Sequence, residues 1–170
     1  MKSKNGQINE IIKCGKDPIY FMNKYLKIQH PVKGLIRFNT FDFQDDCVKD
    51  FNDHRFNIIL KSRQLGLSTL VAAYSVWQAC FYKEKNILII ATKLAVAQNF
   101  IRKVKTYIKS MPNWLLVPTV IANNKQQVEF SNGSQIKAVP TSEDAGRSEA
   151  LSLLIVDEAA FVRNFDELWM

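Results

Sequence analysis

Apolar and polar positions follow two different periods along the chain, and these predict strands and helices in turn. Short apolar runs at residues 56–60, 87–91 and 153–156 are typical of buried strands. Residues 68–82 and 94–110 contain no Gly or Pro and predict longer helices, the second of which is stopped by Pro112. Shorter helices are predicted at residues 19–26 and 44–51.

A hairpin is predicted between residues 127–130 and 135–139. Both segments alternate in polarity, and the Asn132-Gly133 pair between them favours the positive φ of a tight turn. Because strands alternate with helices elsewhere, we expect an α/β domain over residues 17–170, with a largely parallel sheet and a ligand at the carboxyl ends of its strands. Residues 1–16 are polar and rich in lysine, and are expected to be a mobile start.

The segment between the 56–60 run and the 68–82 helix resembles a phosphate-binding loop with a displaced lysine. Aligned on Gly66, Leu67 stands where the loop lysine is expected, Ser68 takes the hydroxyl position, and Lys61 replaces the first glycine. A strand-to-helix turn presents free N–H groups to an anion. We therefore expect a nucleotide site formed by Lys61, Ser62, Arg63, Gln64, Leu65, Gly66, Leu67, Ser68 and Thr69.

Leucine cannot neutralise a phosphate, so a cation must come from elsewhere. Lys61 and Arg63 are the nearest candidates in sequence, and the residues do not decide between them. An ordinary basic turn between a strand and a helix is the alternative interpretation of the whole segment.

Asp157 and Glu158 follow the 153–156 run directly, which is the form of a Walker B strand. In that arrangement the first acid, together with Ser68, holds Mg²⁺. The second acid, Glu158, polarises the attacking water. A buried strand that ends in a solvated pair of acids is the alternative, although the order of the two segments favours one shared site.

From Asp17 onward the chain resembles the N-terminal ATPase domain of the large terminase subunit of tailed bacteriophages, the motor that pumps DNA into an empty capsid. The Ser62-Arg63-Gln64-Leu65-Gly66 segment and the run from Val156 to Phe161 carry this resemblance, with support from Asp17-Pro18-Ile19-Tyr20-Phe21 and Phe43-Gln44. It implies a P-loop NTPase fold of the ASCE type, a three-layer sandwich around a mostly parallel sheet.

The resemblance also implies roles for individual residues. Gln44 matches a glutamine that pairs with the adenine edge. Arg63 matches an arginine that stabilises transition-state charge within the same subunit. Arg147 matches an arginine that reaches into a neighbouring subunit's site. The implied activity is hydrolysis of ATP with Mg²⁺, coupled to translocation of double-stranded DNA.

The same resemblance implies a setting for the chain: the cytoplasm of an infected bacterial host, a homo-oligomeric ring, and portal protein and small terminase subunit as partners. In that family more sheet and a nuclease domain follow the Walker B strand. We therefore expect a fragment truncated after that strand, without nuclease residues, that binds ATP weakly and hydrolyses it slowly or not at all by itself. Two alternatives stay open: a superfamily 2 helicase or related translocase, and a DNA- or capsid-binding fragment that hydrolyses nothing.

Composition is consistent with a polyanionic partner. The 170 residues contain 23 Lys plus Arg against 16 Asp plus Glu, a net charge of +7, which favours DNA although it also serves solubility. No apolar run reaches the roughly 18 residues that a membrane span needs. Three widely spaced cysteines predict free thiols and no zinc site.

Overall fold

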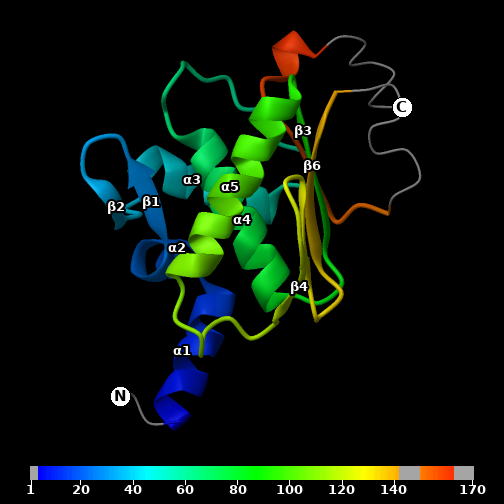
Figure 1. The fold of residues 1–170 in the computed structure, drawn as a ribbon. Helices are drawn as coiled ribbons and strands as arrows, with labels where there is room; N and C mark the ends of the chain where they lie inside the picture. The colour runs from blue at the N-terminus through cyan, green and yellow to red at the C-terminus, as the bar shows by residue number, and fades with distance from the viewer. Residues whose placement is uncertain (1–3, 142–149, 163–170) are drawn as a thin grey trace.

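The structure is a computed structural model that describes residues 4–141 and 150–162 (Figure 1). Its elements in chain order are α1 (Lys4–Lys16), α2 (Pro18–Tyr25), β1 (Lys27–His30), β2 (Gly34–Arg37), α3 (Asp42–Asp53), α4 (Leu67–Phe81), β3 (Asn86–Ala91), α5 (Leu94–Ser110), β4 (Val120–Asn123), β5 (Gln127–Phe130), β6 (Gln135–Pro140), β7 (Leu153–Val156) and the 3₁₀ turn η1 (Ala159–Phe161). None of the helices in the described ranges is long and apolar enough to cross a bilayer.

The main sheet has the strand order β4-β5-β6-β3-β7, and β1 pairs with β2 in a separate ribbon. Strands β6, β3 and β7 are parallel, whereas β4, β5 and β6 are antiparallel, so the sheet is mixed. The predicted hairpin is confirmed, with Gly133 at φ 80° in its turn. Among the described strands, β7 forms one edge of the sheet, and its carboxyl end lies beside that of β3.

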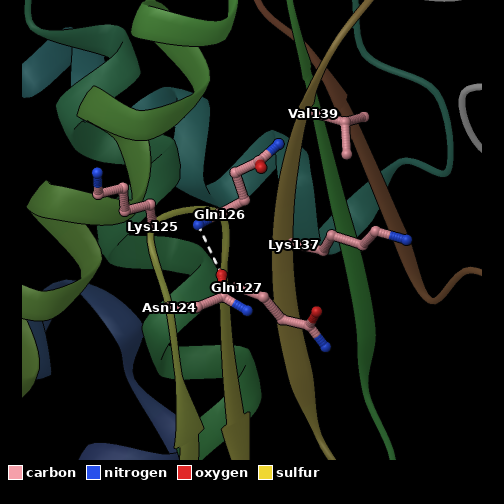
Figure 2. Close-up of a pocket in the computed structure, with 6 residues that line it drawn as sticks. All are labelled: Asn124, Lys125, Gln126, Gln127, Lys137 and Val139. Atoms are coloured by element: carbon pink, nitrogen blue, oxygen red, sulfur yellow. Dashed lines mark hydrogen bonds between the residues drawn. The ribbon is translucent and has the colours of Figure 1, made fainter.

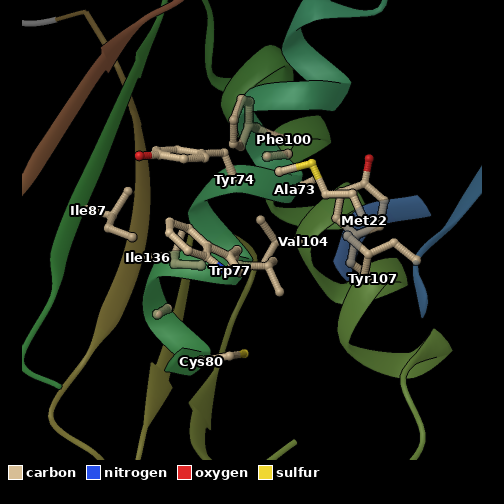
Figure 3. Close-up of a cluster of buried hydrophobic side chains, with 14 of the residues drawn as sticks. Met22, Ala73, Tyr74, Trp77, Cys80, Ile87, Phe100, Val104, Tyr107 and Ile136 are labelled. Atoms are coloured by element: carbon tan, nitrogen blue, oxygen red, sulfur yellow. The ribbon is translucent and has the colours of Figure 1, made fainter. Parts of the chain in front are cut away.

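Helix α4 is the centre of the core. Its residues are buried on nearly every side, because α2, α3, α5 and strands β3 and β6 of the sheet all pack against it. Figure 3 shows Tyr74 and Trp77 of α4 between Ile87 and Ile136 of the sheet and the apolar side chains of α5. Helices α3, α4 and α5 lie on one face of the sheet (Figure 1), which gives two layers within the described residues.

Several elements agree with the sequence analysis. Helix α5 occupies the predicted residues, and α2, α3, β3 and β7 lie where their patterns placed them. Strand β4 was not predicted. It is only four residues long, and its pairing with β5 is interrupted by a register shift between Val120 and Ala122, so its pattern of alternation is short.

The strand predicted at residues 56–60 is wrong. These residues are irregular, and Ile58 and Leu60 are fully exposed, at 101% and 102%. A strand needs a neighbour to take up its N–H and C=O groups. In the described part of the chain the sheet runs from β4 to β7 without including this segment, so no strand pairs with its backbone.

The expectation of a mobile start is corrected for Lys4–Lys16, which form α1. Cys14 is completely buried, and its carbonyl accepts a hydrogen bond of 2.9 Å from Trp77 Nε1. Glu10 holds the helix against α2, because its Oε1 accepts from Tyr20 Oη at 2.7 Å, Lys24 Nζ at 2.7 Å and Tyr25 Oη at 2.8 Å. These partners lie outside residues 4–16, so the composition of the segment alone could not predict that it packs as a helix.

Candidate functional site

The loop before α4 ends in a left-handed residue that opens the helix. Gly66 has φ 71° and ψ 11° and is the N-cap of α4. Its carbonyl accepts from Thr69 N at 3.0 Å and Leu70 N at 2.9 Å, which starts the helical ladder. The first N–H groups of a helix have no acceptor within it. The start of α4 therefore has the donors and the partial positive charge that suit an anion.

Leu67 points into the protein rather than toward such an anion. Its side chain is only 6% exposed and belongs to the main core. The residue that stands in the lysine position therefore contributes packing and no charge. The adjacent Lys61, Ser62, Arg63, Gln64 and Leu65 are all exposed, and Gln64 adopts φ 66°.

Ser68 and Asp157 meet across the fold. Ser68 Oγ, in the first turn of α4, donates a hydrogen bond of 2.9 Å to Asp157 Oδ2. Asp157 is fixed at the end of β7, because its backbone N donates to Ile90 O of β3 at 3.0 Å. The two segments that the sequence analysis assigned to one site are thus in direct contact.

The Ser68 and Asp157 pair fits a magnesium ion chemically. Hydroxyl and carboxylate oxygens are the ligands that Mg²⁺ takes, and it commonly keeps several waters beside one or two protein groups. In the described ranges no cluster of three His, Cys, Asp or Glu side chains forms an all-protein cage. One carboxylate and one hydroxyl leave the remaining positions to water and to a phosphate.

Glu158 has an unusual backbone conformation. It adopts φ 57° and ψ 45°, and its side chain is exposed beside the η1 turn, where its carbonyl accepts from Phe161 N at 2.8 Å. A left-handed conformation at a residue with a Cβ costs about 1 kcal/mol or more. This conformation ends the extended backbone of the strand, so the side chains of Asp157 and Glu158 need not point to opposite faces as successive strand residues do. Both can therefore border one site.

The side chain of Gln44 contacts the loop directly, at a backbone carbonyl. The Gln44 side chain is 2% exposed, its Nε2 donates to Leu65 O at 2.9 Å, and its Oε1 accepts from Phe41 N at 3.2 Å. Both ends of the amide are thus engaged within the protein. Gln44 ties α3 to the loop, whereas the adenine contact expected from sequence stays a prediction.

Two residues of α5 were missing from the sequence analysis. Tyr107 Oη donates to Thr69 O at 3.0 Å, so α5 touches the first turn of α4. Lys103, one turn earlier, is partly buried. Burial lowers the pKa of its ammonium, and the Asp157 carboxylate acts in the opposite, raising direction. No motif marks these residues, because their place depends on how α5 crosses α4.

Arg147, the remaining residue predicted from sequence, lies outside the described residues.

The hollow shown in Figure 2 is not lined by residues of the loop. Its volume is about 430 Å³, and its lining comes from β6, the start of β5 and the turn before it. Within it, Gln126 N donates to Asn124 Oδ1 at 2.8 Å, and Lys125 and Lys137 supply positive charge. The described site residues predicted from sequence are therefore absent from the lining of this hollow.

Comparison with known proteins gives a family and a fold for the chain. Residues 58–170, more than half of the chain, match the family model described as terminase large subunit, T4likevirus-type, N-terminal. The crystal structure of the HK97 bacteriophage large terminase is similar in fold, with a TM-score of 0.66 and 16% sequence identity over 85% of this chain. The chain spans 31% of the length of that terminase.

Proposed function

Since the chain belongs to the terminase large-subunit family, we propose that it forms the nucleotide-binding core of a viral DNA-packaging ATPase. The observation that carries this proposal is the contact between Ser68 and Asp157. It joins a helix N-terminus suited to phosphate with an acidic strand end suited to Mg²⁺. These are the two halves of a site for a magnesium nucleotide.

Each residue has a distinct role in this proposal. The N–H groups at the start of α4 bind phosphate oxygens, and Ser68 and Asp157 hold the metal ion. When bound, Mg²⁺ supplies charge neutralisation for the phosphates. Glu158 accepts a proton from the attacking water as general base. Lys61 and Arg63, exposed on the loop, are able to swing toward phosphate, and Arg63 serves the transition state.

The wider setting is proposed from family membership and charge. The net charge of +7 suits double-stranded DNA as the translocated polymer. Portal protein and small terminase subunit are the proposed partners of a homo-oligomeric ring in the cytoplasm of an infected bacterium. Arg147, expected to act between subunits, belongs to the same proposal.

The proposal is tested by calorimetric titration of the chain with ATP in the presence and absence of Mg²⁺. We expect Mg²⁺ to strengthen binding, and Ser68→Ala or Asp157→Asn to remove most of that gain. Glu158→Gln should keep the binding and abolish any turnover, because only water activation is lost.

Two matched variants serve as controls. Ser75→Ala removes a hydroxyl from the same helix, where Ser75 Oγ donates to Val71 O at 2.7 Å, about two turns from the loop. Asp46→Asn removes an exposed carboxylate of α3 that pairs with Lys49 at 2.8 Å. Neither should change the effect of Mg²⁺. Nucleotide binding that is absent, or that ignores Mg²⁺, would contradict the proposal and favour a fragment that binds DNA or capsid alone.

A further inference from the structure

The start of α4 lacks a nearby fixed cation from its own loop. Leu67 is buried, and Lys61 and Arg63 are exposed on an irregular segment. A helix N-terminus offers only about half a unit charge. A triphosphate carries several negative charges, so a further ammonium or guanidinium group is needed close to Ser68.

Helix α5 passes beside this position. Figure 1 shows α5 running across α4, and both helices pack on the same face of the sheet. The crossing is fixed by Tyr107, which is 1% exposed and donates to Thr69 O at 3.0 Å. Thr69 follows Ser68 directly, so the last turn of α5 is tied to the first turn of α4.

Lys103 lies four residues before Tyr107, on the same face of α5. Side chains of a helix lean toward its N-terminus, and α5 begins just after the carboxyl end of β3. That end is also where Asp157 is held, through its bond to Ile90 O. The stem of Lys103 therefore leads from the α4 crossing toward the Ser68 and Asp157 pair.

The electrostatics of Lys103 agree with this direction. Burial lowers the pKa of its ammonium, while the Asp157 carboxylate raises it. The residue that raises this pKa, Asp157, is also the residue proposed to hold the metal ion. An ammonium that has lost part of its water shell is a stronger partner for an incoming anion than a fully hydrated one.

We infer that Lys103 supplies the phosphate-binding cation that Leu67 cannot, from α5 rather than from the loop. This inference rests on the proposed nucleotide site. Without nucleotide, the Asp157 carboxylate favours the charged form of the Lys103 ammonium. With Asp157 engaged by a metal ion, a phosphate oxygen becomes the partner of the ammonium. Lys103 is therefore a binding residue that reaches the site through tertiary packing.

The alternative role of Lys103 is structural: a counter-charge that only keeps Asp157 in place. The two roles differ in which nucleotides they affect. A phosphate-binding ammonium discriminates by the number of phosphates, whereas loss of a structural counter-charge distorts the site for every nucleotide alike. Affinity for ATP compared with AMP therefore separates them.

The test is calorimetric titration of the chain and of Lys103→Met with MgATP and with AMP. Methionine keeps an unbranched stem and removes the charge. We expect MgATP binding to weaken about 10-fold or more, as for loss of one charge-assisted hydrogen bond, with AMP binding unchanged. Lys103→Arg should restore part of the MgATP affinity. Lys103→Gln gives a second neutral variant if the methionine variant folds poorly.

Arg102→Met is the matched control, since Arg102 is the exposed neighbour on the same helix, and it should leave both affinities unchanged. Unchanged MgATP binding in Lys103→Met, with a loss in Lys61→Ala or Arg63→Ala, would overturn the inference and return the role to the loop. An equal loss of MgATP and AMP would overturn it in favour of the structural role. If the unsubstituted chain binds no nucleotide, the proposed function fails and the inference fails with it.

Discussion

Gln44 and Gly66 are fitted to each other: a Cβ placed on Gly66 would lie 2.9 Å from Gln44 Nε2. The same Nε2 donates to Leu65 O, so the space above Gly66 is occupied by the side chain that holds the loop. The glycine is thus required both by its positive φ and by the approach of Gln44. The loop and α3 are coupled at this point.

Gly66→Ala should therefore cost more than another alanine placed at positive φ. The left-handed conformation costs about 1 kcal/mol, and displacement of the Gln44 hydrogen bond about 1 kcal/mol more. Gly34→Ala is the control, because Gly34 has φ 70° with nothing within 4 Å of its Cβ position. Urea unfolding should give a free-energy loss about twice as large for Gly66→Ala. Equal losses would mean that Gln44 moves aside freely.

Gln44→Ala should weaken binding of ATP and GTP by similar factors. The side chain holds the loop through Leu65 O and Phe41 N, so its loss loosens the phosphate site without regard to the base. Competition titrations with both nucleotides provide the measurement. A selective loss of ATP would instead support the adenine contact expected from sequence.

Leu67→Lys should destabilise the protein and fail to improve nucleotide binding, although it restores the lysine of the standard loop. The leucine is buried in the core, and replacing it with an ammonium costs about 3 kcal/mol or more. Leu60→Lys, at a fully exposed position, should change the free energy of unfolding by about 0.5 kcal/mol or less. Stronger MgATP binding by a stable Leu67→Lys variant would show that position 67 faces the phosphates after all.

The buried thiol of Cys80 should lower the free energy of unfolding of the protein at alkaline pH. Burial raises the pKa of its thiol from 9.0 to about 12. Between these pH values the unfolded chain has released the proton while the folded chain keeps it, so stability is complete below pH 9.0 and falls as pH rises, by about 1.4 kcal/mol per pH unit. Urea unfolding at pH 8 and pH 10 measures this loss.

Cys80→Ala is the comparison for that measurement. It removes the thiol and leaves the tyrosines, which also titrate in alkali, unchanged. The stability difference between the two proteins should shrink by about 1.4 kcal/mol from pH 8 to pH 10, since one unit of that interval lies above 9.0. Parallel pH curves would mean that Cys80 is accessible to water.

The sequence correctly predicted those helices and strands whose apolar periodicity and end signals lie within the element itself. Helix α5 carries its own periodicity and its own stop, so its bounds agree with the structure. Residues 56–60 have an equally clear pattern, but a β-type sequence reports only suitability for a pleated, half-buried surface. Whether that surface exists depends on a neighbouring strand, and none of the described strands pairs with residues 56–60.

The candidate site was predictable in outline for the same reason. Ser68 and Asp157 lie at the ends of recognisable segments, and sheet topology brings such ends together. The contact of Gln44 with Leu65 spans 21 positions. The approach of Lys103 depends on one helix crossing, where the contact of Tyr107 with Thr69 spans 38 positions. Leu67 illustrates the limit further: alignment gives its place in the loop, whereas only packing shows which way it points.

The exposed run at residues 56–60 has a consequence for the handling of the protein. Ile58 and Leu60 present bare apolar side chains to water within a short β-prone sequence, a combination that favours self-association of chains at high concentration. The net charge of +7 opposes this by mutual repulsion, which reaches only about 10 Å in 0.1 M salt. Colloidal stability of this chain therefore depends on ionic strength: dilute, low-salt buffer keeps it dispersed, and added salt brings it closer to precipitation.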